Sequence, residues 1–375
     1  MSDNFNGSIA QVNVQFPIET VIQPLAGEAY SRALVYIPAS QAENYLPGVS
    51  GAAAGQLVEL NSNNYGELTA GTLKNSLVPF FTKATTAKLG IAIYDDGEEA
   101  STNKLADVYA GTKMWAYFKF GITEAEGYNA LQVSLSNLCI TDPLYSDLWI
   151  GTSDTNVLTQ TSALITSLKA AGSNARVIYN SNAGINAALA QLGSSLSVVN
   201  TTGTPVGNNV DMAAFNTIEA SGTADANGKR QNLSATEKAA LDAQKIGYNT
   251  YVGDGTENVV TEGSLTLKGE SVGANWVKHY IEYVCKVKAA NLITRMNKFR
   301  NNATYQAILS IVTDTAMAFV AFGRLADLHL TAPVFTDLPA SGDAITVPNA
   351  WEATYIDNVR SVTVYGTLYL TQPTR

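Results

Sequence analysis

The residues DLWIGTSDTNVLTQTSALITSLKAAGSNARVIYNS, at 147–181, decide the fold class of this chain. The segment opens with the apolar strand pattern DLWIGTS, continues with the helical pattern QTSALITSLKAAG and returns to the strand pattern ARVIYNS. A second helical pattern at 183–193 and a strand pattern at 196–202 repeat the alternation. Strands that alternate with helices predict βαβ units and a partly parallel sheet.

The chain before this segment is rich in strand patterns that are separated by turns. They lie at 33–39, 55–61, 88–96, 114–122 and 131–137. After it, Ser234 with Glu237 three residues later is typical of a capped helix start, and Gly247 marks the predicted helix end. Further strands are predicted at 248–255 and 264–270. The whole pattern indicates an α/β (α+β) fold, with a mixed sheet and flanking helices.

Two long helices are predicted in the last third of the chain, at 275–299 and 304–322. Apolar residues recur in each at helical spacing, which predicts one buried face per helix. The first stripe comprises Trp276, Tyr280, Val284, Val287 and Ala290, widened by Val277 and Ile281. The second comprises Tyr305, Ile308, Val312, Met317, Phe319 and Val320, with Gly323 at the helix end.

Both ends of the chain carry strand patterns. Apolar residues alternate with polar ones before Pro17 and again from Val362 to Leu370. These apolar residues are Val12, Val14 and Phe16 at one end, and Val362, Val364, Leu368 and Leu370 at the other. Terminal strands fray unless something pairs with them, and from the pattern alone pairing within the chain's own sheet is the ordinary expectation.

Composition argues against several classes of function. Among 375 residues only 15% are charged, and the net charge is −9, which disfavours a nucleic-acid partner. The longest apolar stretch, 316–323, is shorter than the roughly 20 residues needed to span a bilayer, so no membrane insertion is expected. The N-terminus lacks the basic head and apolar core of a secretory signal.

No catalytic, metal or cofactor constellation is found in the sequence. Two cysteines, Cys139 and Cys285, and two histidines, His279 and His329, are too few for a zinc site, and each histidine is predicted to be a packing or surface residue. GDGTEN at 253–258 lacks the third glycine of a dinucleotide loop. We therefore expect that the chain is not an enzyme and binds no cofactor.

The first long helix and the residues after it carry a local positive charge. Between 276 and 300 there is one acidic residue, Glu282, in a chain that is acidic overall. The basic residues there are Lys278, Lys286, Lys288, Arg295, Lys298 and Arg300. One interpretation is a solvated helix face, and the other is a docking surface for an acidic protein partner.

The second half resembles the contractile tail sheath proteins of bacteriophages and related injection systems. Four segments follow the order of that family: LSATEKAALDAQKIGYNTYVGDGTENVVTEG, SVGANWVKHYIEYVCKVKAANLI, TYQAILSIVTDTAMAFVAFG and GDAITVPNAWEATYIDNVRSVTVYGTLYLTQ. The resemblance implies an N-terminal arm (1–24), a variable α/β region (25–230), a sheath core with the two long helices (231–358) and a C-terminal strand arm (359–375).

The resemblance also implies a function. Sheath subunits polymerise into a helical tube of stacked hexameric rings around an inner tail tube, meet baseplate and tail terminator proteins, and contract to drive the tube through a target envelope. Their arms add strands to a neighbour's sheet, which here would use the seven terminal apolar residues. The basic stretch, with Lys286, Lys288, Arg295, Lys298 and Arg300, would face the inner tube. The particle would be a virion that is assembled in the cytoplasm of a host bacterium.

Two other classes of function stay open from the residues. One is a different self-assembling virion protein, such as a tube, capsid or surface-layer subunit. The other is a hydrolase or nucleotide-binding enzyme that is built on the βαβ segment.

Overall fold

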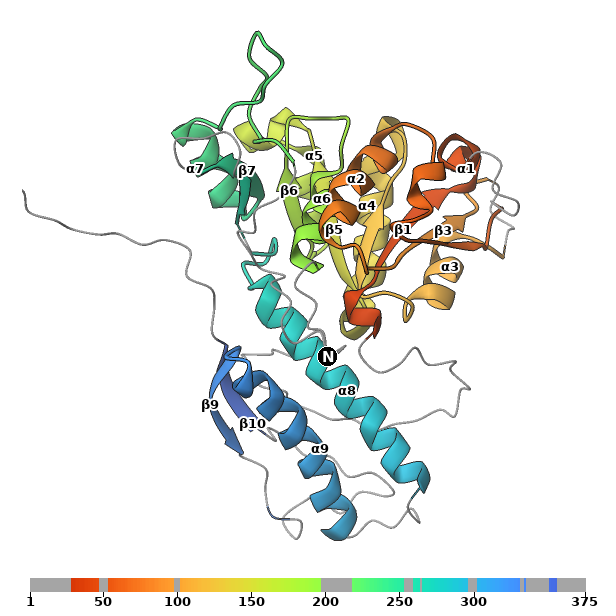
Figure 1. Cartoon of the computed structure of the whole chain (residues 1–375), viewed down its shortest axis with the longest axis vertical. Coiled ribbons are helices and arrows are strands. Elements are labelled where there is room, and N and C mark those ends of the chain that lie inside the picture. The colour runs from red at the N-terminus through yellow and green to blue at the C-terminus, as the bar shows by residue number, and fades with distance from the viewer. Residues whose placement is uncertain are drawn as a thin grey trace, which may run out of the picture.

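The computed structural model describes residues 28–46, 53–97, 102–196, 218–252, 259–263, 265–295, 302–330, 334 and 351–355. These residues form two units (Figure 1). The α/β unit is built on one large sheet, and the C-terminal unit consists of two long helices and a small sheet. The first of these helices runs from the α/β unit into the C-terminal unit (Figure 1).

The sheet of the α/β unit has eight strands in the order β2-β3-β1-β4-β5-β6-β7-β8. They are β1 (Ala33–Pro38), β2 (Leu57–Leu60), β3 (Leu89–Tyr94), β4 (Phe118–Gly121), β5 (Asp147–Thr152), β6 (Arg176–Tyr179), β7 (Gly247–Tyr251) and β8 (Val259–Glu262). Pairing is parallel from β3 through β7, and antiparallel at β2 and at β8. The predicted mixed α/β sheet is confirmed. Along the chain, its parallel strands start with β1, well before the segment at 147–181.

Helices cover both faces of this sheet. They are α1 (Ala39–Tyr45), α2 (Thr72–Lys83), α3 (Leu105–Thr112), α4 (Ala125–Thr141), α5 (Ala163–Ala170), α6 (Ala187–Leu196) and α7 (Ala235–Gln244). Strand β1 shows the two layers, because Val35 and Ile37 join the core beneath α2 and α6 whereas Leu34 and Tyr36 join the core beneath α3, α4 and α5. Burial on both faces explains why the strand is apolar throughout rather than alternating.

One predicted strand is a helix. Residues 131–137 lie inside α4, where the buried residues Leu131, Leu135 and Cys139 are four positions apart. That spacing is the helical period, and the alternation of Leu131, Val133 and Leu135 in a short window imitates a strand. The strand prediction for this segment was therefore wrong.

The strand predicted at 264–270 was also misplaced. The edge strand β8 ends at Glu262, and residues 266–269 form a tight turn. The backbone N–H of Thr266 donates to the Glu270 carbonyl at 2.9 Å, and Gly269 has a φ of 82°. A positive φ at this glycine closes the turn, so the apolar residues around it do not extend into a strand.

The predicted start of α7 is confirmed by reciprocal hydrogen bonds between Ser234 and Glu237. The helix ends before the predicted glycine, with Lys245 in the left-handed region at φ 65°. Gly247 instead begins β7, where an added Cβ would lie 2.9 Å from the Gly263 carbonyl oxygen. Close approach of two strands, rather than a helix end, requires glycine here.

The C-terminal unit contains α8 (Val272–Arg295), α9 (Asn302–Ala321), β9 (Leu325–Leu330) and β10 (Trp351–Tyr355). Both predicted helices exist, and Trp276 and Ile281 of α8 are buried with Tyr305 and Phe319 of α9. Met317, predicted to face inward, is 48% exposed. The buried face of α9 passes through Thr315, Ala316 and Phe319 and leaves Met317 outside it.

By length and composition alone, α9 is one helix in the described part of the chain that could cross a membrane. Buried core helices meet the same criterion, and the apolar face of α9 packs into the core that it shares with α8. A third of the apolar window of α9 is buried in the structure, so the fold accounts for one face of the helix.

Candidate assembly surfaces

The two histidines lie one in the core and one at the surface. The Tyr117 hydroxyl and Nδ1 of His279 are 2.8 Å apart, and burial, with the charge of Lys278, lowers the pKa of His279 to about 3. His279 is therefore neutral at physiological pH and is the packing residue that the sequence predicts. His329 lies exposed on β9, opposite Glu352.

The two cysteines are buried thiols. Burial raises the pKa of both Cys139 and Cys285 to about 12, so neither is a thiolate at neutral pH. Within the described ranges, no group of three or more histidine, cysteine, aspartate and glutamate side chains could hold a metal ion.

Ligands of open α/β sheets bind at the carboxyl ends of the strands, where the strand order reverses. In this sheet the reversal lies between β1 and β4. Oε1 of Gln41 accepts there from the backbone N–H of Glu124 at 2.9 Å and from the Thr123 hydroxyl at 3.1 Å. Asp95 and Asp96 line the adjoining crevice. A phosphate would meet acidic side chains here, beside a backbone donor that Gln41 already occupies.

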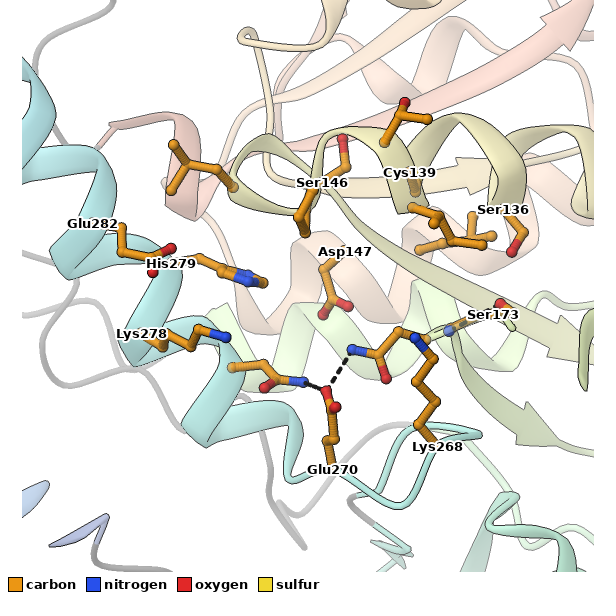
Figure 2. A pocket seen from close by; sticks show the side chains of 18 residues that line it. Ser136, Cys139, Ser146, Asp147, Ser173, Lys268, Glu270, Lys278, His279 and Glu282 are labelled. Carbon is orange, nitrogen blue, oxygen red and sulfur yellow. Dashed lines mark hydrogen bonds between the residues drawn. The ribbon is translucent and has the colours of Figure 1, made fainter. Parts of the chain in front are cut away.

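A polar cavity of about 540 Å³ lies at the opposite, amino ends of the strands, between β5, β6 and α8. Figure 2 shows Asp147 in this cavity, facing Lys278 and His279 of α8. Burial raises the pKa of Asp147 to about 7, while a hydrogen bond from Nε1 of Trp149 at 2.7 Å acts in the opposite direction. Titratable groups with shifted pKa values gather at functional sites and also in structural networks.

The contacts around Asp147 favour a structural network. Its carboxylate is held by Trp149, whose ring lies 4.4 Å from the guanidinium carbon of the fully buried Arg176. Glu270 accepts from Nδ2 of Asn174 at 2.7 Å and from Nδ2 of Asn275 at 2.9 Å (Figure 2). These bonds join the loop before β6 to the first turn of α8, so the cavity lies at the junction of the two units.

In the described residues, the small sheet of the C-terminal unit has two strands. Strands β9 and β10 pair antiparallel, with Trp351 opposite Leu330 and Tyr355 opposite Leu325. The register shifts between Glu352 and Thr354, and Asp327 in the facing strand has a φ of 53°, which places a bulge there. Within the described ranges each strand has one neighbour, an arrangement to which further strands can be added.

The residues of the predicted basic stretch differ in their surroundings. Nζ of Lys286 donates to the Tyr145 hydroxyl at 2.9 Å and lies 5.5 Å from the centre of that ring, which fixes this lysine at the junction. Lys288 is exposed, with Nζ 3.5 Å from Oγ1 of Thr315. Arg295 is the last residue of α8, and nothing is described of its side chain. Lys298 and Arg300 lie outside the described residues.

The predicted strand joints also lie outside the described residues. They are Val12, Val14, Phe16, Val362, Val364, Leu368 and Leu370. The strand predicted at 196–202 lies almost entirely there as well. The division at residue 230 stays a prediction, and the large sheet continues past it into β7 and β8.

No protein-family model and no curated protein matches the chain. Solved structures do match it. The helical sheath of the anti-feeding prophage in its contracted state has a TM-score of 0.61 and 12% identity over 94% of this chain and 99% of that chain. The baseplate structure of the same prophage has a TM-score of 0.59 and 13% identity, covering 96% and 99%.

A third match is the sheath complex of the extracellular contractile injection system PVC in its contracted state. Its TM-score is 0.58 at 13% identity, covering 95% of this chain and 98% of that chain. At such identities the likeness is one of fold, and it spans nearly the full length of each protein. The family resemblance predicted from the second half of the sequence is confirmed for the fold of the whole chain.

Proposed function

We propose that this chain is the structural subunit of a contractile sheath, which polymerises into a helical tube around an inner tube and shortens to drive it through a target envelope. The observation that carries the proposal is the full-length likeness to sheath subunits of two contractile injection systems. A second observation supports it: in the described residues the sheet of the C-terminal unit has two strands, a number that is marginal on its own.

The joints between subunits use the terminal arms. The segments with Val12, Val14 and Phe16, and with Val362, Val364, Leu368 and Leu370, add as strands to the sheet of β9 and β10 in neighbouring subunits. Each backbone hydrogen bond contributes about 1 kcal/mol net, so several per joint hold a lattice of many joints together. An extended linker at each joint lets subunits rotate during contraction without separating.

The inner tube is the second partner. The sheath subunit contacts it through a positive surface that comprises Lys288, Arg295, Lys298 and Arg300. Lys286 contributes its charge at the junction of the two units, where it contacts Tyr145. Electrostatic contacts of this kind set register and encounter rate more than affinity, which suits a sheath that must release its tube on contraction.

The finer features of the assembly follow the same proposal. The subunits stack in hexameric rings, contact a baseplate at one end and a tail terminator protein at the other, and assemble in a bacterial cytoplasm into a virion or a virion-like particle. The stroke is driven by additional surface that is buried between subunits in the contracted state.

The experiment is electron microscopy of the purified chain at rising concentration, with a matched pair of arm variants. The full chain should form striated hollow tubes. Val364→Asp places a charge on the apolar face of the arm and should abolish tubes while leaving a folded monomer. Thr363→Asp, on the opposite face of the same strand, should leave them intact.

Two outcomes would overturn the proposal. One is a monodisperse particle at every concentration for the unmodified chain. The other is a thermal shift of several degrees on adding nucleotides, which would favour an enzyme on the α/β unit instead.

A further inference from the structure

Tyr30 lies near the start of the described residues, a few positions after the end of the predicted N-terminal arm (1–24). It belongs to a short 3₁₀ helix, η1 (Glu28–Ser31), and is 1% exposed. Its ring stacks on Tyr117 at 4.6 Å and 19°, and meets Tyr280 of α8 edge-on at 5.4 Å. Tyr283, one turn further along α8, lies 5.3 Å from the same ring. The root of the arm is therefore enclosed by aromatic rings from both units.

Hydrogen bonds reinforce this packing: α8 donates to the backbone of Tyr30, and the Tyr30 hydroxyl donates to the backbone of α8. Nε1 of Trp276 in α8 donates to the backbone carbonyl of Tyr30 at 3.1 Å. The Tyr30 hydroxyl lies 2.9 Å from the His279 carbonyl oxygen and also within reach of the Leu144 carbonyl. The hydroxyl of Tyr117, next to β4, bonds Nδ1 of the neutral His279. Buried polar networks of this kind specify one arrangement, because breaking any bond leaves a buried group unsatisfied.

The contacts continue into α9. Phe319 lies 5.5 Å from the Tyr280 ring and 6.3 Å from the Trp276 ring, so the second long helix packs on the same cluster. Two turns further along α8 from His279, Lys286 bonds the hydroxyl of Tyr145, which precedes β5. Contacts between α8 and the α/β unit thus extend from the first turns of the helix to its middle.

We propose that Tyr30, Tyr117, Trp276, His279, Tyr280 and Tyr283, the aromatic joint, fasten the root of the N-terminal arm to α8 and make the two units one cooperative body. The joint lets a subunit move as a whole when a neighbour pulls on its arm, and that consequence rests on the proposed function. The coupling of the units does not, because it is a property of the unassembled chain.

The test uses the full chain below the concentration of assembly, so its outcome is independent of whether sheaths form. Tyr30→Phe and Tyr117→Phe together remove two hydroxyls and keep every ring. The unmodified chain should unfold in a single calorimetric transition and the double variant in two. In the double variant, amides at 276–284 should exchange with solvent at least tenfold faster than those of β4 and β5. The control is Tyr36→Phe, a fully buried tyrosine whose hydroxyl lies 3.1 Å from Oγ1 of Thr112 within the α/β unit. It should lower the melting temperature and keep one transition.

A second measurement keeps the proposal testable if the double variant does not fold. In the unmodified chain, amides of α8 at 276–284 should exchange through the same opening as those of β4 and β5. Exchange of α8 a hundredfold faster than of these strands would overturn the proposal. An unsplit transition in the double variant, or a split one in Tyr36→Phe, would overturn it as well.

Discussion

The α/β unit and the C-terminal unit differ in the sheets that their described residues form. The eight-stranded sheet has both faces covered, and its edge strand β2 has four residues, with Glu59 in an ion pair with Lys88 at 3.2 Å. A short, charged edge discourages further pairing. In the described residues the C-terminal sheet has two strands, a number that is marginal on its own. The comparison teaches that the described residues complete one sheet, whereas they supply two strands of the other, to which the proposed function adds strands from neighbouring subunits.

The largest effect is expected from the arms. Deleting residues 360–375 should abolish tube formation, because the receiving sheet of every neighbour then loses a strand. The melting temperature of the remaining monomer should stay within about 2 °C, since the α/β unit makes its core without the arm. Scanning calorimetry together with electron microscopy checks both parts. An unfolded or insoluble product would mean that the arm is a core strand of its own subunit.

The next effect concerns the interior of the α/β unit. A Cβ at Gly193 in α6 would lie 2.4 Å from Cα of Phe80 and 2.5 Å from its carbonyl oxygen in α2. Gly193→Ala should therefore force the two helices apart and lower the free energy of unfolding by about 3 kcal/mol.

The matched control is Gly111→Ala in α3, where an added Cβ meets nothing within 4 Å. This change should raise the free energy of unfolding by up to about 1 kcal/mol. Urea denaturation measures both variants. Equal effects at the two glycines would show that contact between α2 and α6 does not hold this unit together.

A smaller, pH-dependent effect is expected at the junction of the units. Burial raises the pKa of Asp147 to about 7 from an unfolded value of 3.8, so its contribution to stability is present below pH 3.8 and is lost as the pH rises to about 7. Asp147→Asn keeps an acceptor for the Trp149 N–H and does not titrate.

The melting temperature of Asp147→Asn relative to the unmodified chain should therefore rise between pH 4 and 7 and then level off. The gain at pH 8 should be on the order of 2–4 °C. Melting curves in a pH series measure it. Parallel curves for the two proteins over this range would contradict a protonated Asp147 in the folded state.

The smallest effect separates two neighbouring lysines of α8. Lys286→Met removes the bond to Tyr145 and should cost about 0.5–1 kcal/mol of stability, whereas Lys288→Met, at an exposed position, should change it by less than about 0.3 kcal/mol. Urea denaturation of both variants gives the comparison. An equal loss would mean that Lys286 contributes no more to the junction than a solvated side chain does.

Local patterns in the sequence predicted much of the fold. The alternation of strands and helices around 147–181 gave β5, α5 and β6, and the capping residues Ser234 and Glu237 gave the start of α7. They failed where two periods fit the same residues, as at 131–137, and where a bulge interrupts a strand. Asp327, in the left-handed region inside β9, breaks the alternation there, so the sheet of β9 and β10 was not predicted.

Contacts between distant segments could not be predicted in this way. Tyr30 and His279 are separated by 249 positions, and no periodicity links a residue before β1 to the first half of α8. The burial of Asp147 beside Trp149 and Arg176 likewise depends on how β5 and β6 pair, which one sequence does not reveal. The proposal of a helical assembly came from the family resemblance, because contacts between subunits cannot be predicted from patterns within one chain.

The most direct test of the central claim is a helical reconstruction by electron cryomicroscopy of tubes formed by the full chain. The account predicts that the sheet of β9 and β10 in each subunit gains strands from the N-terminal arm of one neighbour and the C-terminal arm of another. Arms that fold back onto the sheet of their own subunit, or tubes held together only by contacts between α/β units, would contradict it.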